Sequence, residues 1–274
     1  MRNDFIDQAA SLRRLFGDSA VRAVSIAPGS RSVGCTAVTL NLAAALARAG
    51  HRVLVVDRTG HEAAAALGLE PHDHIARLPA TERELAGAVL PGPAGISVLP
   101  VACNAQHPDQ RVRDWRIELG RLLQALPRRF SVCVINDLES AVGATIASGA
   151  GFGDTLLVIT PDADTITAAY ARIKTLCRGG SRGDYRIVIN RAGSEAAALT
   201  VYRNMADAVR RFLSAQLHYC GFIPDEQALP RAVHAPARPL FADPGSACGR
   251  AFQRLAETVL LAPPVSGGRC AAAC

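Results

Sequence analysis

The loop PGSRSVGCT, residues 28–36, is the stretch of the chain with the residue types best suited to chemistry. It follows an apolar run and precedes an Ala/Leu-rich segment, the layout of a strand, a glycine-rich turn and the first turn of a helix. Backbone N–H groups in such a turn bind phosphate oxygens, and Thr36 stands where a hydroxyl would ligate Mg²⁺. The preceding position, where a lysine would neutralise phosphate charge, holds Cys35. The competing interpretation is a tight turn with a helix cap and no ligand.

Length and composition indicate a globular protein. The chain has 274 residues, of which 49% are hydrophobic, enough for one large α/β domain with a sizeable core or for two small domains. No apolar run is long enough for a membrane helix, and the N-terminus lacks a signal-peptide core, so we expect a cytoplasmic protein. The eight cysteines form no CxxC pair, which favours reduced, mostly buried thiols over disulfides or a metal site.

The charge is mildly basic, at +6. Basic residues never occur in runs longer than two, which indicates a solvated surface, and no specific nucleic acid is expected as a partner. Lys174 is the only lysine of the chain, so no residue before it can supply a phosphate-binding ammonium group.

Strand and helix patterns alternate along most of the chain. We expect strands at 21–27, 52–57, 96–101, 131–136, 155–160, 185–190 and 216–223. We expect helices at 36–49, 109–125, 163–177, 195–214 and 248–261, and a short N-terminal helix at 4–16. Nearly continuous Val/Ile/Leu strands between helices predict an α/β fold, a doubly wound, mostly parallel sheet with helices on both faces. The predicted units are a helix and linker at 1–19, the α/β domain at 20–261 and a flexible tail at 262–274.

Several segments resemble the MinD/ParA group of P-loop ATPases with a deviant Walker motif. The loop and the following TAVTLNLAAALARAGHRVLVVD are similar to that group. DTITAAYARIKTL, RIVINRAGS and RFLSAQLHYCGFIPDEQALPRAV resemble its FlhG family, which sets flagellar number and placement. The resemblance covers roughly residues 4–260 and implies a P-loop fold with a site for ATP and Mg²⁺. The nucleotide-binding residues that it implies are Gly29, Arg31, Gly34, Cys35, Thr36, Asp57, Asp137, Asn190 and Arg191, with Thr36 as the Mg²⁺ ligand.

The segment DQAASLR matches the DQAxxLR motif at FlhG N-termini. In that family this helix binds FlhF, a signal-recognition-type GTPase, and stimulates its GTP hydrolysis. The apolar stripe that contains Leu12 and Phe16 would dock in a groove, and Gln8 would orient a water near the partner's GTP. The partner-binding residues are therefore expected to be Asp7, Gln8, Ala9, Leu12, Arg13 and Phe16. The alternative is a helix that packs on its own domain.

The nucleotide site departs from the family at four positions. The family loop reads KGGVGKT, whereas Ser30 and Cys35 replace its two lysines here. Thr59 replaces the second aspartate of an Asp-x-Asp motif, and the metal-side aspartate is either Asn136 or displaced by one to Asp137. Because phosphoryl transfer depends on positioned charge, these changes predict lost or very weak ATP hydrolysis and leave the binding of ATP and Mg²⁺ open.

Two other functions stay open at this point. The chain could be a working MinD-like ATP switch that dimerises and associates with membrane, or a ParA-like DNA-binding protein. The C-terminal helix 248–261 has few basic residues, which favours core packing and weak or absent membrane association. The FlhG resemblance also admits flagellar basal-body proteins or transcription regulators as partners, and recruitment to the cell pole or membrane by a partner.

Overall fold

The computed structural model describes residues 21–59, 62–70, 81–101, 122, 129–137, 154–178, 184–225 and 241–261. The expected N-terminal helix with its DQAASLR motif and the tail 262–274 lie outside the described residues, as does nearly all of the helix expected at 109–125.

An eight-stranded sheet forms the centre of the described structure, with the order β3-β4-β2-β5-β1-β6-β7-β8. Neighbouring strands are parallel except for the β3–β4 pair. The strands are β1 (Arg22–Pro28), β2 (Val53–Asp57), β3 (Leu90–Pro91), β4 (Ile96–Pro100), β5 (Val132–Asn136), β6 (Asp154–Ile159), β7 (Asp184–Ala192) and β8 (Gln216–Pro224). All seven strands expected from the sequence are confirmed, and β3 is an additional short antiparallel edge strand.

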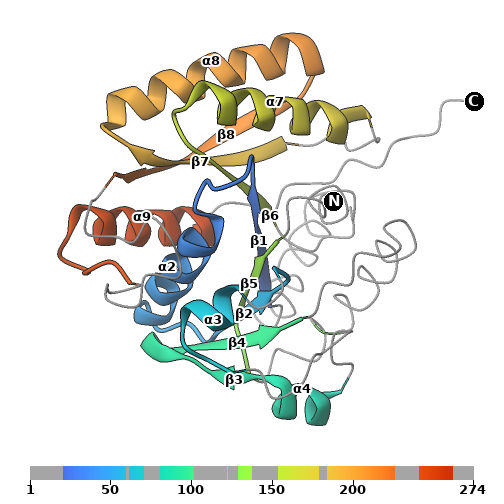
Figure 1. Cartoon of the computed structure of the whole chain (residues 1–274), viewed down its shortest axis with the longest axis vertical. Helices are drawn as coiled ribbons and strands as arrows, with labels where there is room; N and C mark the ends of the chain where they lie inside the picture. The colour runs from blue at the N-terminus through green and yellow to red at the C-terminus, as the bar shows by residue number, and fades with distance from the viewer. Residues whose placement is uncertain are drawn as a thin grey trace, which may run out of the picture.

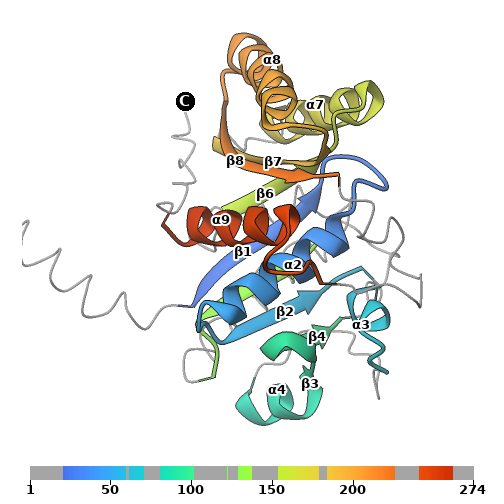
Figure 2. The ribbon, with the colours of Figure 1, turned by 90° about the vertical axis from the view of Figure 1, so that its left-hand side faces the viewer.

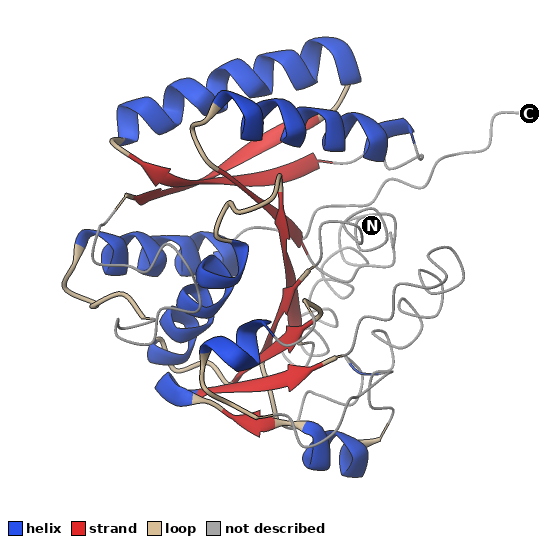
Figure 3. Ribbon diagram, in the orientation of Figure 1, coloured by secondary structure: helices blue, strands red, loops and turns tan. Residues whose placement is uncertain are grey.

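Helices cover both faces of the sheet, as the sequence predicted (Figures 1 and 3). They are α2 (Cys35–Arg48), α3 (Glu62–Ala66), α4 (Glu82–Ala88), α7 (Ala163–Arg178), α8 (Glu195–Leu213) and α9 (Ala247–Leu261). Helices α2 and α9 pack side by side on one face, which Figure 2 shows in front of the strands. Helices α7 and α8 lie on the other face, over β6, β7 and β8. The sequence missed α3 and α4.

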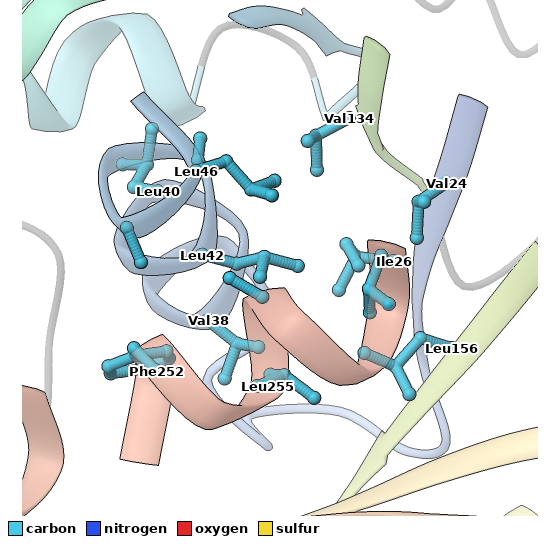
Figure 4. Packing of buried hydrophobic residues seen from close by; sticks show 14 of the residues in the cluster. Val24, Ile26, Val38, Leu40, Leu42, Leu46, Val134, Leu156, Phe252 and Leu255 are labelled. Atoms are coloured by element: carbon cyan, nitrogen blue, oxygen red, sulfur yellow. The ribbon is translucent and has the colours of Figure 1, made fainter. Parts of the chain in front are cut away.

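Helix α2 follows the loop directly, and most of its residues are buried. Its apolar residues pack against β1 and α9, where Ile26, Leu42 and Phe252 are almost completely buried (Figure 4). Asn41, within this helix, accepts a 2.7 Å hydrogen bond from the Ala242 backbone N–H, which ties the segment before α9 to α2. The core-packing role expected for the C-terminal helix is confirmed. None of the helices in the described part of the chain is long and apolar enough to cross a membrane.

Candidate functional site

The loop between β1 and α2 lies at the carboxyl edge of the sheet and has a tightly specified backbone. Ser32 and Gly34 have φ angles of 58° and 81°, the left-handed region that glycine adopts without strain. A Cβ atom on Gly34 would lie 2.8 Å from Asn190 Nδ2, so a larger residue would have to displace that side chain as well as adopt the left-handed φ. A Cβ on Gly29 would lie 2.5 Å from the Ile159 side chain. Close packing therefore favours glycine at position 29, and the left-handed backbone favours it at position 34.

Three side chains from later elements hold the loop's carbonyl groups. Arg172 of α7 donates to the Pro28 carbonyl at 2.5 Å. Asn190, in β7, donates from Nδ2 to the Val33 carbonyl at 2.8 Å, and Arg191 donates to the Ser32 carbonyl at 3.1 Å. The sequence predicted Asn190 and Arg191 at the nucleotide, and the structure places both beside the loop; it missed Arg172. Two of the three contacts come from guanidinium groups, so positive charge lies beside a loop that lacks lysine.

Cys35 occupies the lysine position and turns inward. Its thiol donates to the Ile26 carbonyl of β1 at 3.5 Å. Burial raises the pKa of the Cys35 thiol far above its ordinary value, and the carboxylates of Asp137 and Glu62 raise it further. The side chain is therefore a neutral thiol, and it supplies no charge for a phosphate.

Thr36 follows in the first turn of α2, and its hydroxyl already has two partners. It donates to Glu62 Oε2 at 3.0 Å and accepts from Asn136 Nδ2 at 3.3 Å. The sequence gave no signal for Glu62, an exposed residue at the start of α3. Its carboxylate engages the hydroxyl that would ligate a magnesium ion.

The side-chain amide of Asn136 is the hub of this buried cluster. Its Nδ2 group donates toward Thr36, toward Asp57 Oδ1 at 3.2 Å and, more weakly, toward Thr59 Oγ1 at 3.4 Å. Its Oδ1 accepts from Thr39 Oγ1 at 3.1 Å. Asn136 is fully buried. Between the two positions that the sequence left open for the metal-side residue, Asn136 is the one that contacts Thr36.

Asp57 is the last residue of β2 and is completely buried, and both of its carboxylate oxygens accept hydrogen bonds. Besides the Asn136 contact, Oδ1 accepts from the Thr59 backbone N–H at 3.1 Å and from Thr59 Oγ1 at 2.6 Å. Oδ2 accepts from the backbone N–H groups of Ala63 and Ala64 at 2.8 and 3.3 Å. The carboxylate thus fixes the first turn of α3, because a helix N-terminus stabilises an anion that accepts its N–H groups.

Asp137 lies next to Asn136 in the chain but makes a separate set of contacts. It forms an ion pair with Arg58 at 2.5 Å and accepts from Ser25 Oγ at 3.2 Å. Both charged side chains are almost completely buried, with 9% and 0% of their surfaces exposed. The sequence predicted that Asp137 belongs to the nucleotide site, and in the structure its carboxylate is paired with Arg58. Arg31, the other loop residue named from the sequence, is exposed.

The fit of this cluster to Mg²⁺ can be judged from its hydrogen-bond donors. Hard cations bind oxygen ligands, whereas the Nδ2 group of Asn136 directs its donors toward the oxygens of Thr36 and Asp57. No group of three His, Cys, Asp or Glu side chains suited to a metal ion occurs within the described residues. As arranged here, the residues around Thr36 do not fit a magnesium ion.

Comparison with known proteins gives a consistent result. Residues 24–237 match the CobQ/CobB/MinD/ParA nucleotide binding domain family. The chain is 30% identical over 245 residues to the antiactivator FleN of Pseudomonas aeruginosa, covering 87% of this chain and 86% of that protein. It is 24% identical over 223 residues to the flagellum site-determining protein YlxH of Helicobacter pylori, covering 77% and 72%. The solved structure of the septum site-determining protein MinD with Mg-ADP, from Pyrococcus horikoshii, superposes with a TM-score of 0.58 at 21% identity, covering 87% and 96%.

Proposed function

The chain belongs to the CobQ/CobB/MinD/ParA nucleotide binding domain family, as an FlhG-type member, and from this premise we propose that it regulates flagellar number or placement. The observation that carries the proposal is the 30% identity to FleN, which extends over 87% of the chain. A second flagellar protein, YlxH, is similar over 77% of it.

The regulatory step of this proposal is stimulation of the GTPase FlhF by the segment 4–16. Its support is the DQAASLR motif, which lies before the first strand and matches the motif at FlhG N-termini. Gln8 would position the attacking water, and Leu12 and Phe16 would fill an apolar groove on the partner. The chain would act in the cytoplasm, at the site to which its partner recruits it.

The α/β domain, in this proposal, no longer hydrolyses ATP. The neutral thiol of Cys35 replaces the phosphate-loop lysine. Asn136 donates to Thr36 and Asp57 at the place where the family binds its metal ion. Each positioned charge of this kind contributes several kcal/mol to phosphoryl transfer, so the loss of several together abolishes efficient turnover. The domain then serves as the carrier of the N-terminal segment.

The experiment is GTP turnover by the cognate FlhF at rising concentrations of the full-length protein. Gln8→Ala should abolish stimulation while much of the binding remains, because Gln8 acts on the water. Leu12→Ala should weaken binding by about 2 kcal/mol, the usual loss at an interface hot spot. Arg14→Ala is the matched control, since Arg14 falls on the opposite side of the expected helix from the Leu12 stripe.

If Gln8→Ala stimulates GTP turnover as strongly as the unchanged protein does, the segment 4–16 is not the element that stimulates FlhF. An ATP-dependent dimer, detected by light scattering, would instead favour a MinD-like switch.

A further inference from the structure

Glu62 brings a negative charge to the first turn of α2, which has no acidic residue of its own. Its Oε2 accepts from Thr36 Oγ1 at 3.0 Å, so the carboxylate lies at the helix end that the loop presents to ligands. The N-terminus of a helix stabilises an anion, whether that anion is a phosphate or a carboxylate. Glu62 therefore brings a negative charge from α3 to the N-terminal turn of α2, at the hydroxyl that would ligate Mg²⁺.

The backbone and the side chain of Glu62 are held differently. The next two residues, Ala63 and Ala64, donate their N–H groups to the buried Asp57 carboxylate at 2.8 and 3.3 Å, which anchors the start of α3. The Glu62 side chain is exposed, and the hydrogen bond to Thr36 is its contact with the loop. A carboxylate on a fixed backbone with an exposed side chain can leave the loop without unfolding of α3.

The charges around the loop make this carboxylate an effective competitor for an anion. Burial, then the charges of Asp137 and Glu62, raise the pKa of the Cys35 thiol while the Arg172 guanidinium lowers it, so the Glu62 charge is felt at Cys35 as well as at Thr36. No lysine stands at this end of the loop, because Cys35 is neutral, and the guanidinium groups of Arg172 and Arg191 donate to the carbonyls of Pro28 and Ser32. An incoming triphosphate meets a like charge at the point where it needs a donor.

We propose that Glu62 is an internal anion that closes the loop against nucleoside triphosphates, and that its carboxylate must leave Thr36 before a triphosphate can bind. The contact is an autoinhibitory one, made within the chain, and Glu62 sets the affinity of the loop for ATP. This inference concerns the α/β domain alone and does not depend on FlhF or on residues 4–16.

The test is isothermal titration calorimetry of the full-length protein with ATP, once in EDTA and once with MgCl₂. Glu62→Ala removes the charge and the acceptor, and should tighten ATP binding at least tenfold under both conditions. Glu62→Gln keeps an acceptor for Thr36 without the charge, and should give an intermediate gain. Glu195→Gln is the matched control, because Glu195 is also an exposed glutamate at the first position of a helix. It should change the affinity less than twofold. Circular dichroism of each variant checks that the fold is retained.

Every other result overturns the proposal. Unchanged or undetectable ATP binding by folded Glu62→Ala at millimolar ATP would show that Glu62 does not close the loop. An equal gain in Glu195→Gln would assign the effect to overall charge. Weaker binding by Glu62→Ala in MgCl₂, without a change in EDTA, would make Glu62 a metal ligand instead. FlhF is absent from this assay, so its outcome is separate from that of the proposed function.

Discussion

Asn136 and Asp137 are neighbours at the end of β5, but they sit in opposite electrostatic environments. Asn136 is neutral and lies among hydroxyl groups and the Asp57 carboxylate, toward which its amide donates. Asp137 is charged and is paired with the buried guanidinium of Arg58. The Asp57 carboxylate accepts a hydrogen bond from the neutral amide of Asn136, whereas the Asp137 carboxylate pairs with the guanidinium of Arg58.

The difference shows two ways to satisfy a buried carboxylate. A buried ion pair needs an exact partner, because removal of either charge leaves the other uncompensated in a medium of low polarity. An amide hub distributes the cost over several weaker hydrogen bonds, each contributing about 0.5–1.5 kcal/mol, or more with a charged acceptor. The Asp137 side should therefore be the more sensitive of the two to a single substitution.

The largest expected effect is at the ion pair. Asp137→Ala removes the buried carboxylate that pairs with the buried Arg58 guanidinium, and should lower the free energy of unfolding by about 3–5 kcal/mol. Urea unfolding followed by circular dichroism measures the loss. Asp207→Ala breaks the exposed Arg210–Asp207 pair and should cost about 0.5 kcal/mol or less. Comparable losses in the two variants would contradict the comparison, and Asp137→Asn gives a second reading if the alanine variant does not fold.

A smaller loss of stability is expected at Asn136, where a second carboxylate should make the folded state depend on a bound metal ion. Asn136→Asp brings a second carboxylate to within hydrogen-bonding distance of Asp57, since the replaced Nδ2 lies 3.2 Å from Asp57 Oδ1. Stability should fall by about 2 kcal/mol at neutral pH without metal, because like charges repel.

The pH dependence of this variant has a definite sign. Repulsion raises the pKa of the carboxyl pair in the folded state above its unfolded value, so the loss is complete above the folded pKa and disappears as pH falls below the unfolded one. MgCl₂ should restore the stability of Asn136→Asp and leave that of the unchanged protein as it was. A melting temperature of the unchanged protein that rises with MgCl₂ would show that its cluster already binds the ion.

The third effect is chemical and leaves the fold intact. The raised pKa of the Cys35 thiol keeps its thiolate fraction negligible at pH 8, and only the thiolate reacts with iodoacetamide. Cys133 should behave in the same way, since burial raises its pKa to about 12. We expect both to react at least ~100-fold more slowly in the folded protein than in urea, as measured by peptide mass spectrometry. Rapid labelling of Cys35 in the folded state would place its thiol at the surface of the loop.

The sequence was a good guide to the large elements of the fold. Continuous Val/Ile runs identified seven strands, and amphipathic or Ala/Leu-rich segments identified α2, α7, α8 and α9. It missed α3, whose first turn donates two backbone N–H groups to the carboxylate of Asp57. Short elements of this kind depend on tertiary contacts, which local patterns do not contain.

The sequence showed which catalytic side chains of the family the site lacks, but not which contacts the residues in their place would make. Cys35, Thr59 and Asn136 broke the family pattern visibly. Strand alternation also contained the answer to the choice between Asn136 and Asp137, because Val132 and Val134 of β5 face the α2 core and the period of two continues to Asn136. No pattern in the sequence indicated that Glu62 would reach Thr36, since that contact needs the folded positions of β2 and α3.

The most direct test of the account is ATP turnover by the purified full-length protein with Mg²⁺, with Thr36→Ala assayed in parallel. If the amide of Asn136 and the thiol of Cys35 have replaced the chemistry of the site, release of phosphate from the unchanged protein should equal that of the buffer blank, and Thr36→Ala should make no difference. Turnover at the rate of ordinary MinD-like enzymes, lost in Thr36→Ala, would contradict the account.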